Sequence, residues 1–446
     1  MSDDKRATFG SKLSVILVSA GSAIGLGAIW RFPYIAGKHG GAAFLLVFLL
    51  SVFVVGIPAM VAEFAVGRKT HKNAVGAYRE LSKKWSWLGY SGVVGSLFIS
   101  GYYYVIAGWS LEYLFSSATG ALYSTQESFS QLFNSFQASY RPMIYAVIFI
   151  LLTHIIVVRG VKNGIEKASR VMMPALFVIL MIMAVRVLFM PNAIEGYRFF
   201  LSPDFEKAFS PDTIMMAIGQ AFFSLSVGIG CMVTYASYFK QSNNLISTSF
   251  NVSILTLMVS LLAGLVIFPA VFSAGLQPAE GPSLIFITLP EIFKGIPLAA
   301  LWSSVFFLLV TLASLTSTIS FHEVLTAYLS EEFKITRKWA ARLVSGVSIV
   351  LSILTLTVVF DFNILSTKVT SFIDIYDSVT ANVIMPLGAM FTCIFVSWFM
   401  KRSFLKEQLS NNGKIKGIFV PIIIFMLRYV TPLFILYIFL QNLGVF

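Results

Sequence analysis

The 446-residue chain is rich in apolar residues and poor in charge, with 57% hydrophobic residues, 12% charged residues and a mean hydropathy of +0.83. This composition is typical of a polytopic membrane protein and excludes a soluble enzyme. The net charge of +12 is spread over short segments between apolar runs, which excludes a nucleic-acid-binding face. The longest polar stretches, 116–141 and 192–212, are loop-sized, so we expect a single membrane domain over 1–446.

Eleven apolar runs are long enough to cross a bilayer as helices. The polar residues before the first run lead into an apolar segment too long for a signal-peptide core, so this run is expected to remain as the first span. Cys231 and Cys393 fall inside apolar runs, where buried thiols are expected rather than a disulfide. In chain order the runs are 11–36, 41–67, 87–115, 142–158, 171–190, 213–239, 245–272, 298–328, 339–358, 370–400 and 418–440.

Lysine and arginine collect after the second, fourth, eighth and tenth runs, which places these four loops on one side of the membrane. Short cytoplasmic loops carry the positive excess, so the pattern predicts a cytoplasmic N-terminus and an external C-terminus. We therefore expect a multi-pass protein of the inner or plasma membrane, surrounded by lipid.

Three glycines, Gly21, Gly25 and Gly27, interrupt the first apolar run. Glycine weakens a helix, and hydrocarbon tolerates irregular backbone only where it is buried in protein or lines a cavity. The stretch 20–27 therefore predicts a helix break that forms a binding site. The alternative is that Gly21 and Gly25, four residues apart, only allow close helix packing.

A second glycine-containing stretch, 224–230, interrupts the sixth run at a similar depth. Paired broken helices in the two halves of a chain indicate a secondary transporter with its substrate at the midplane. One half-helix offers N–H groups and its positive dipole end to a carboxylate, and the other offers carbonyl oxygens to a cation. Such a site suits a zwitterion with a companion cation.

The eighth run carries a dense series of hydroxyl groups at 314–318, which includes Thr316 and Ser317. Two adjacent hydroxyls supply oxygen ligands to a hard cation, with carbonyls of the first break completing the site. The alternative is that each hydroxyl bonds back to the preceding turn of its own helix.

Charged residues inside apolar runs are costly and usually face a partner or a watery path. Arg31 follows the first break and Asp377 lies early in the tenth run, which predicts an outer gate, with a static ion pair as the alternative. Glu63 and Glu323 are predicted to brace free N–H groups of a broken helix, with a proton relay as the alternative. His322 is expected to be a packed, hydrogen-bonded histidine rather than a proton carrier.

These residues lie in motifs that resemble the neurotransmitter:sodium symporter family. The stretch 20–27 is followed by Trp-Arg-Phe-Pro at 30–33, and similar matches continue in the right order over nearly the whole chain. The resemblance implies an all-α integral membrane fold of two inverted five-helix repeats, 11–190 and 213–400, with broken first and sixth helices. One extra helix, 418–440, follows, as in bacterial members with eleven spans. The further matches are 40–41, 56–58, 63–68, 103–109, 219–226, 234–238 and 315–317.

The resemblance implies an amino-acid substrate whose carboxylate meets the N–H groups of Leu26 and Gly27 and the hydroxyl of Tyr103. Its ammonium is expected at carbonyls near Ala23 and the second break. Gly25 stands where monoamine carriers have aspartate, which argues for an α-amino acid. The implied pocket is mostly apolar, so we expect a hydrophobic or aromatic side chain. Its walls are Ile99, Tyr103, Phe223, Ser226, Ile229, Ser317 and Phe321.

Sodium (Na+) is the coupling ion that the resemblance implies. The first sodium site of the family is incomplete, because Ala28 replaces an asparagine and leaves Ala23, Ser224 and Thr256 with the substrate carboxylate. Coupling to one sodium ion through the second site is therefore expected. The second site is complete, with the carbonyls of Gly21, Ile24 and Ala313 and the hydroxyls of Thr316 and Ser317.

Chloride (Cl−) is left open by the resemblance. Ser260 stands where chloride-independent relatives place a carboxylate, which favours an anion near Gln220 and Ser224. However, Phe48 replaces the tyrosine that usually completes the anion site.

The resemblance also implies an inner gate at the cytoplasmic face. Arg6 and Phe9 match its N-terminal part, and Tyr238 and Glu331 are the expected partners. Glutamate at 331 replaces the usual aspartate and is expected to keep the pairing.

The sequence thus predicts a sodium-driven symporter that imports a hydrophobic or aromatic L-amino acid by alternating access. Two alternatives on the same fold stay open, namely a non-transporting amino-acid sensor and a leaky cation channel. An enzyme is not expected, because the apolar runs show no closely spaced His, Asp and Glu set for a metal and no nucleophile beside a base.

Overall fold

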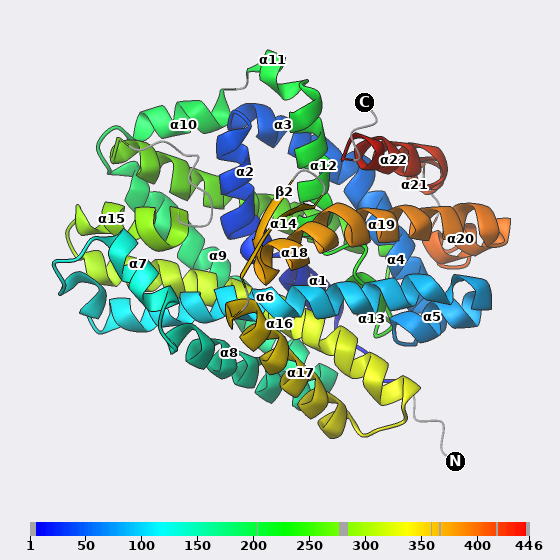
Figure 1. Cartoon of the computed structure of the whole chain (residues 1–446). Coiled ribbons are helices and arrows are strands. Elements are labelled where there is room, and N and C mark those ends of the chain that lie inside the picture. The colour runs from blue at the N-terminus through cyan, green and yellow to red at the C-terminus, as the bar shows by residue number, and fades with distance from the viewer. Residues whose placement is uncertain are drawn as a thin grey trace.

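The computed structural model describes residues 6–202, 204–275, 284–357, 359–364, 367–415 and 418–442, and most of them lie in helices (Figure 1). The predicted all-α membrane fold is confirmed. Among the described residues, strands occur in one hairpin, formed by β1 (Val359–Ile364) and β2 (Thr367–Ser371).

The first half of the chain runs from the first broken helix to α11 and includes four short helices between the spans, namely α5, α7, α10 and α11. Several spans contain π-helical segments, which are labelled η. The elements are α1 (Lys12–Ala23), η1 (Gly27–Arg31), α2 (Phe32–Lys38), α3 (Ala42–Ser51), η2 (Val52–Gly56), α4 (Ile57–Thr70), α5 (Ala74–Leu81), the 3₁₀ turn η3 (Lys83–Trp85), α6 (Ser86–Ala118), the 3₁₀ turn η4 (Ala121–Tyr123), α7 (Phe129–Gln137), α8 (Arg141–Val158), η5 (Val161–Glu166), α9 (Lys167–Leu188), α10 (Ala193–Leu201) and α11 (Phe205–Ala208).

The second half begins with the second broken helix and ends in the C-terminal span. Its elements are α12 (Pro211–Leu225), α13 (Cys231–Ala236), α14 (Leu245–Ser273), η6 (Leu284–Thr288), α15 (Leu289–Lys294), α16 (Ala299–Glu332), α17 (Arg337–Thr357), the hairpin, α18 (Phe372–Val379), η7 (Thr380–Ile384), α19 (Met385–Ile394), η8 (Phe395–Phe399), α20 (Arg402–Leu409), α21 (Phe419–Phe425), η9 (Met426–Val430) and α22 (Thr431–Asn442).

Polar side chains begin several of these helices. A side-chain oxygen accepts a hydrogen bond from a free N–H of the first turn at Ser11, Asn73, Ser128, Ser210 and Asn244. These caps satisfy donors that a helix start would otherwise leave unpaired. The local sequence therefore determines where α1, α5, α7, α12 and α14 start.

Within the described residues, nine continuous helices are long and apolar enough to cross a membrane, and the pair α1 and η1–α2 makes a tenth span, bent by 56°. The predicted run 213–239 is divided between α12 and α13, so neither piece reaches spanning length. The tenth predicted run begins too early, because 367–371 forms β2 and the span itself covers Ile375–Phe399.

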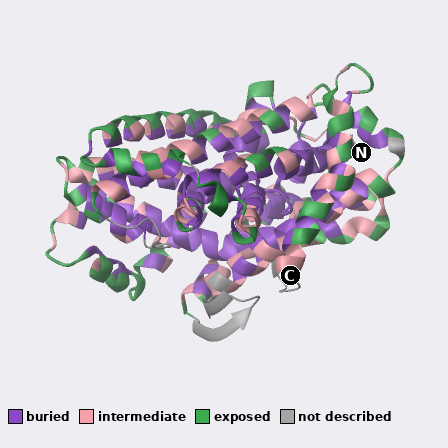
Figure 2. Cartoon of the chain, turned by 90° about the horizontal axis from the view of Figure 1, so that it is seen from above, coloured by how far each residue is buried: buried purple, intermediate pink, exposed green. Residues whose placement is uncertain are grey.

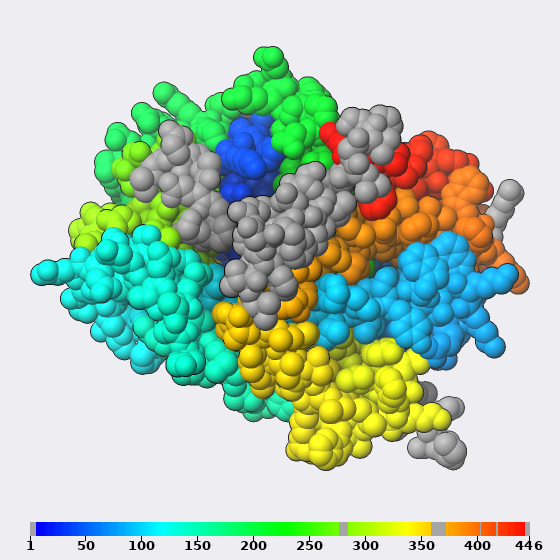
Figure 3. Space-filling view, viewed as in Figure 1, coloured from blue at the N-terminus to red at the C-terminus, as the bar shows by residue number. Residues whose placement is uncertain are grey.

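Buried residues gather near the centre of the molecule and exposed residues around its periphery (Figure 2). Residues of both helix breaks, such as Ile24 and Val227, are buried. The long helices α6 and α16 pack along each other beside α1. In the apolar stretch of α6, 78% of residues are buried, against 33% in α8, which places α6 inside the bundle and α8 at its lipid-facing edge. In Figure 3, blue atoms of the α2 region are visible next to the green atoms of α12.

Candidate functional site

The first break separates α1 from η1. The backbone leaves the helix at Ile24, where φ is −90° and ψ is 91°, and becomes helical again from Gly27. The N–H of Leu26 donates to the hydroxyl oxygen of Tyr103 in α6 at 2.8 Å. The break therefore presents the main-chain N–H of Leu26 to the phenol that the resemblance placed there.

The second break separates α12 from α13 by five residues. Positive φ angles occur at Ser226, Gly228 and Gly230, so the chain turns through left-handed conformations. The N–H of Gly228 donates to a carboxylate oxygen of Glu63 at 2.5 Å. A Cβ atom at Gly228 would overlap the carbonyl oxygen of Met385, so no larger residue fits there without movement. Glu63 thus braces this break, as predicted.

A pocket lies between the two breaks, α6, α16 and the start of α19. The pocket is nearly closed, with a cavity volume of about 10 Å3. Every predicted substrate-binding residue lines the pocket except Leu26, whose N–H donates to Tyr103. Ser22 and Met385 line it too. The lining is Ser22, Ala23, Gly25, Gly27, Ile99, Tyr103, Phe223, Ser226, Ile229, Ser317, Phe321 and Met385.

The pocket has a polar end at the breaks and apolar walls elsewhere. The rings of Tyr103 and Phe321 meet edge to face, with centroids 5.3 Å apart. A Cβ atom at Gly25 would overlap the Ser317 hydroxyl and lie 2.5 Å from the Tyr103 hydroxyl. The pocket therefore has no room for a side chain at position 25 unless Tyr103 and Ser317 move.

Arg31 and Asp377, the residues of the predicted outer gate, lie close together above the pocket. A guanidinium nitrogen of Arg31 is 3.8 Å from a carboxylate oxygen of Asp377. The same guanidinium lies over the ring of Phe223, 4.4 Å from its centroid. Tyr102 donates to Asp377 at 2.9 Å, which fixes the carboxylate from the α6 side. One cluster thus joins the outer half of the first broken helix to α6, α12 and α18.

The predicted ligands of the second sodium site meet between the first break and α16. The Thr316 hydroxyl oxygen lies 3.1 Å from the carbonyl oxygen of Ile24 and 2.8 Å from that of Ala313. A Cβ atom at Gly21 would lie 3.5 Å from Thr316 Cβ. Ser317 Oγ lies 3.4 Å from the carbonyl oxygen of Ser22. Neutral oxygen donors of this kind suit a hard cation.

The predicted side-chain ligands of the first sodium site already form hydrogen bonds with protein groups. The Thr256 hydroxyl donates to the Val252 carbonyl oxygen in its own helix at 3.0 Å. Ser224 Oγ accepts from Gln220 at 2.9 Å, and Ala28 is fully buried without a side-chain oxygen.

The candidate chloride residues lie around Gln220. Its amide nitrogen donates to the Gly27 carbonyl oxygen at 2.8 Å and to Ser224. The amide oxygen of Gln220 and the Ser260 hydroxyl are buried and, among the described residues, form no hydrogen bond. The Phe48 ring stacks on Phe44 with centroids 6.1 Å apart and offers no hydroxyl.

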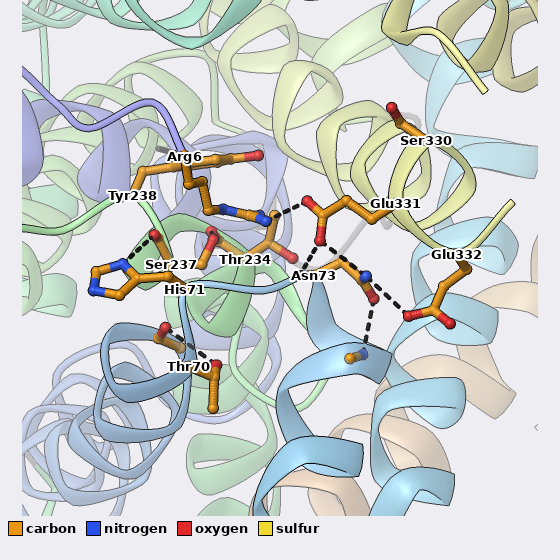
Figure 4. Close-up of polar contacts among 12 residues, drawn as sticks. Arg6, Thr70, His71, Asn73, Thr234, Ser237, Tyr238, Ser330, Glu331 and Glu332 are labelled. Carbon is orange, nitrogen blue, oxygen red and sulfur yellow. Dashed lines mark hydrogen bonds and ion pairs between the residues drawn. The ribbon is translucent and has the colours of Figure 1, made fainter. Parts of the chain in front are cut away.

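The four predicted inner-gate residues come together, and Figure 4 shows Arg6, Tyr238 and Glu331 among them. Arg6 forms an ion pair with Glu331, and its guanidinium lies 4.6 Å from the centroid of the Tyr238 ring. Phe9 meets Tyr238 edge to face, and its N–H donates to the Tyr238 carbonyl oxygen at 3.1 Å. The N-terminal segment is therefore docked against α16 and the segment after α13.

The prediction for Glu323 is wrong. Its carboxylate does not brace a broken helix but accepts from the Tyr238 hydroxyl at 2.6 Å and from Arg337 at 3.0 Å. A buried carboxylate takes a nearby cation as its partner, and Arg337 at the start of α17 was too distant in sequence to be recognised. His322 is fully packed, with Nε2 3.4 Å from the Ser345 hydroxyl oxygen.

Comparison with known proteins decides the family. Residues 6–131 and 125–446 match the sequence model of the "Sodium:neurotransmitter symporter family". The chain belongs to this family. It is 36% identical to a sodium-dependent transporter of Bacillus subtilis over 100% of this chain and 99% of the relative. It is 33% identical to a sodium-dependent transporter of Haemophilus influenzae over 98% of both chains.

The fold of this family member matches that of MhsT, whose crystal structure was solved in complex with L-phenylalanine. The TM-score is 0.90 at 38% identity, over 98% of this chain and 100% of MhsT. The expected family and fold are confirmed, and the chain is a multi-pass membrane transporter rather than an enzyme.

Proposed function

We propose that this family member is a sodium-coupled symporter that imports a hydrophobic or aromatic L-amino acid by alternating access. The observation that carries the proposal is the pocket between the two helix breaks, which combines main-chain groups at one end with the rings of Tyr103, Phe223 and Phe321. The similarity to MhsT, whose structure contains L-phenylalanine, supports an aromatic amino acid.

Substrate recognition divides between backbone and side chains. The N–H groups of Leu26 and Gly27, with the Tyr103 hydroxyl, hold the carboxylate, and the substrate oxygen takes over the Leu26 N–H that now donates to Tyr103. Carbonyl oxygens near Ala23 and the hydroxyl of Ser226 receive the ammonium. The lack of space beside Gly25 supports a substrate that brings its own carboxylate.

One sodium ion couples to this substrate through the second site. Thr316 joins the broken first helix to α16, so a cation there holds together two elements that have to separate when the inner side opens. The first site lacks a side-chain oxygen at Ala28, and the Thr256 hydroxyl is already bonded to its own helix.

The residues around Gln220 and Ser260 are the place where chloride would bind, and chloride dependence is left to measurement.

The N-terminus lies in the cytoplasm and the C-terminus outside, in a plasma or inner membrane, with the repeats over 11–190 and 213–400. Segments predicted to be cytoplasmic meet at one end of the molecule. Arg6 contacts Glu331, and Arg68 donates to Gln408 of α20 at 3.1 Å. The outer-gate pair of Arg31 and Asp377 lies on the opposite side of the pocket, as alternating access requires.

Sodium-dependent binding tests this proposal directly. Purified protein is incubated with radiolabelled phenylalanine, tryptophan, tyrosine or leucine in sodium or in potassium. We expect saturable binding of at least one of them in sodium and its loss in potassium. Equal binding in both salts would contradict sodium coupling. Failure of all four amino acids to bind would contradict the substrate class.

A further inference from the structure

Asn73, at the start of α5, makes contacts beyond those of a helix cap. Its amide oxygen accepts from the Gly76 N–H at 3.0 Å, which is the capping bond. Its amide nitrogen remains free to donate, and it does so to Glu331 at 3.0 Å and to Glu332 at 3.1 Å. The main-chain N–H of Asn73 also donates to Glu331 at 2.8 Å. The side chain is 1% exposed.

Glu331 therefore divides its carboxylate between two partners (Figure 4). One oxygen faces Arg6 and the other receives both bonds from Asn73. The neighbouring carboxylate of Glu332 forms an ion pair with Arg79, with a nitrogen-to-oxygen distance of 2.5 Å. Glu331 is therefore the carboxylate that pairs with Arg6.

A partly exposed ion pair contributes little to stability unless its geometry is fixed. The side chains of Arg6 and Glu331 are 15% and 33% exposed, and a glutamate at the end of a helix has several rotamers. The bonds from Asn73 select the rotamer that faces Arg6. The side chain of Glu331 has then already lost its conformational entropy before the ion pair with Arg6 forms.

We propose that Asn73 is a positioning residue of the inner gate, which holds the Glu331 carboxylate where Arg6 meets it and so favours the closed cytoplasmic side. This inference rests on the proposed function, in which the contact between Arg6 and Glu331 closes that side.

Three residue types at position 73 distinguish a role in the inner gate from a role as the N-cap of α5. Asparagine, serine and aspartate are about equally good helix N-caps. Asn73→Ser keeps a capping oxygen and the main-chain bond to Glu331 but removes the side-chain amide nitrogen that donates to Glu331 and Glu332. Asn73→Asp keeps the cap and adds a negative charge beside both carboxylates. A purely structural role predicts little difference among the three, whereas the positioning role predicts a graded opening of the inner side.

The chain carries its own reporter of that opening. Cys231 is buried at the start of α13, between the pocket residue Ile229 and the gate residue Tyr238 in the sequence. The other thiol, Cys393, is removed by Cys393→Ser. The rate at which a membrane-impermeant thiol reagent, added to the cytoplasmic face of inside-out vesicles in sodium-free solution, labels Cys231 then measures access from that side.

We expect the labelling rate to rise in the order asparagine, serine, aspartate. Loss of bonds to a charged group predicts an increase of about threefold to tenfold for Asn73→Ser. In an Arg6→Ala background the same substitutions should change the rate much less, because the partner that Glu331 is positioned for is gone. Thermal unfolding midpoints should stay close together, since all three side chains cap α5.

The outcomes distinguish this inference from the proposed function. If Arg6→Ala itself leaves labelling unchanged, the inner gate is wrong and the inference fails with it. If Arg6→Ala raises labelling but neither Asn73 variant does, only the positioning role is overturned. The positioning role would also be overturned if Asn73→Asp raised the labelling rate equally with Arg6 and with Arg6→Ala. The added charge would then act through α5 and not through the pair of Arg6 and Glu331. Asn73→Ser decides the matter if the aspartate variant does not fold.

Discussion

The carboxylate of Glu63 in α4 accepts a hydrogen bond from the main-chain N–H of Gly228, at 2.5 Å, in the middle of the second helix break. Glu63 is 1% exposed, so the bond is shielded from water. It satisfies a donor that the interrupted helix leaves free, at a depth where water is not available. The irregular backbone beside the pocket is therefore held by a side chain from another helix.

Removal of this carboxylate should destabilise the protein and the site together. An unpaired buried N–H costs about 1–3 kcal/mol, so Glu63→Ala is expected to lower the thermal unfolding midpoint and substrate affinity. Glu63→Gln keeps an acceptor oxygen and should be milder on both counts. The unfolding midpoint in detergent and the equilibrium affinity for substrate are the two measurements that check this prediction. An alanine variant that binds substrate like the native protein would show that the second break does not need the Glu63 carboxylate.

The two hydroxyls of the proposed sodium site should be required for sodium dependence. Thr316→Ala together with Ser317→Ala removes two oxygen ligands, so sodium-dependent substrate binding should be lost. Ser314→Ala is the matched control, because Ser314 is buried in the same helix but donates at 2.7 Å to the Val310 carbonyl oxygen. Sodium titrations of substrate binding measure the effect. Unchanged sodium dependence in the double variant would place the cation elsewhere.

A methyl group at Gly25 should block the pocket. Its Cβ would overlap the Ser317 hydroxyl, so Gly25→Ala is expected to weaken substrate binding by about tenfold or more, which corresponds to 1.4 kcal/mol. Gly346→Ala serves as the control, because a Cβ at that helical position meets no atom within 4 Å. Competition binding compares the two variants. Native affinity in Gly25→Ala would mean that the substrate lies away from the break.

Sodium dependence should be non-cooperative in the native protein. The proposal contains one complete cation site, since Ala28 supplies no oxygen and Thr256 donates to Val252. Ala28→Asn restores the missing ligand type and is expected to make the sodium dependence of uptake steeper. A native protein that already shows cooperative sodium activation would contradict coupling to a single ion.

The sequence was sufficient to predict the spans, both breaks and most of the pocket, because each depends on local features. Apolar length predicts spans, glycines inside apolar runs predict breaks, and the motif resemblance orders the wall residues. Phe223 and Ser317 are far apart in the chain but were placed in one pocket on this basis. Their roles in binding remain predictions.

Contacts that join distant segments without a motif were not predictable. Met385 lines the pocket because α19 approaches Gly228, and nothing in its local sequence indicates this. Glu323 pairs with Arg337 across a turn between two helices, so its partner could not be read from the intramembrane charge alone. The start of α7 did carry a local signal, a reciprocal cap between Ser128 and Gln131 inside a stretch that was treated as a loop.

Uptake into proteoliposomes tests the central claim of sodium-coupled import. Purified protein is reconstituted, and accumulation of radiolabelled phenylalanine, tryptophan and leucine is followed under an inward sodium gradient, an equal potassium gradient and a proton gradient alone. We expect saturable accumulation above equilibrium of at least one of these amino acids, and only under the sodium gradient. Sodium-dependent binding without accumulation would indicate a sensor, and sodium conductance without saturable uptake would indicate a channel. Either result would contradict the proposed symport, as would accumulation under the proton gradient alone.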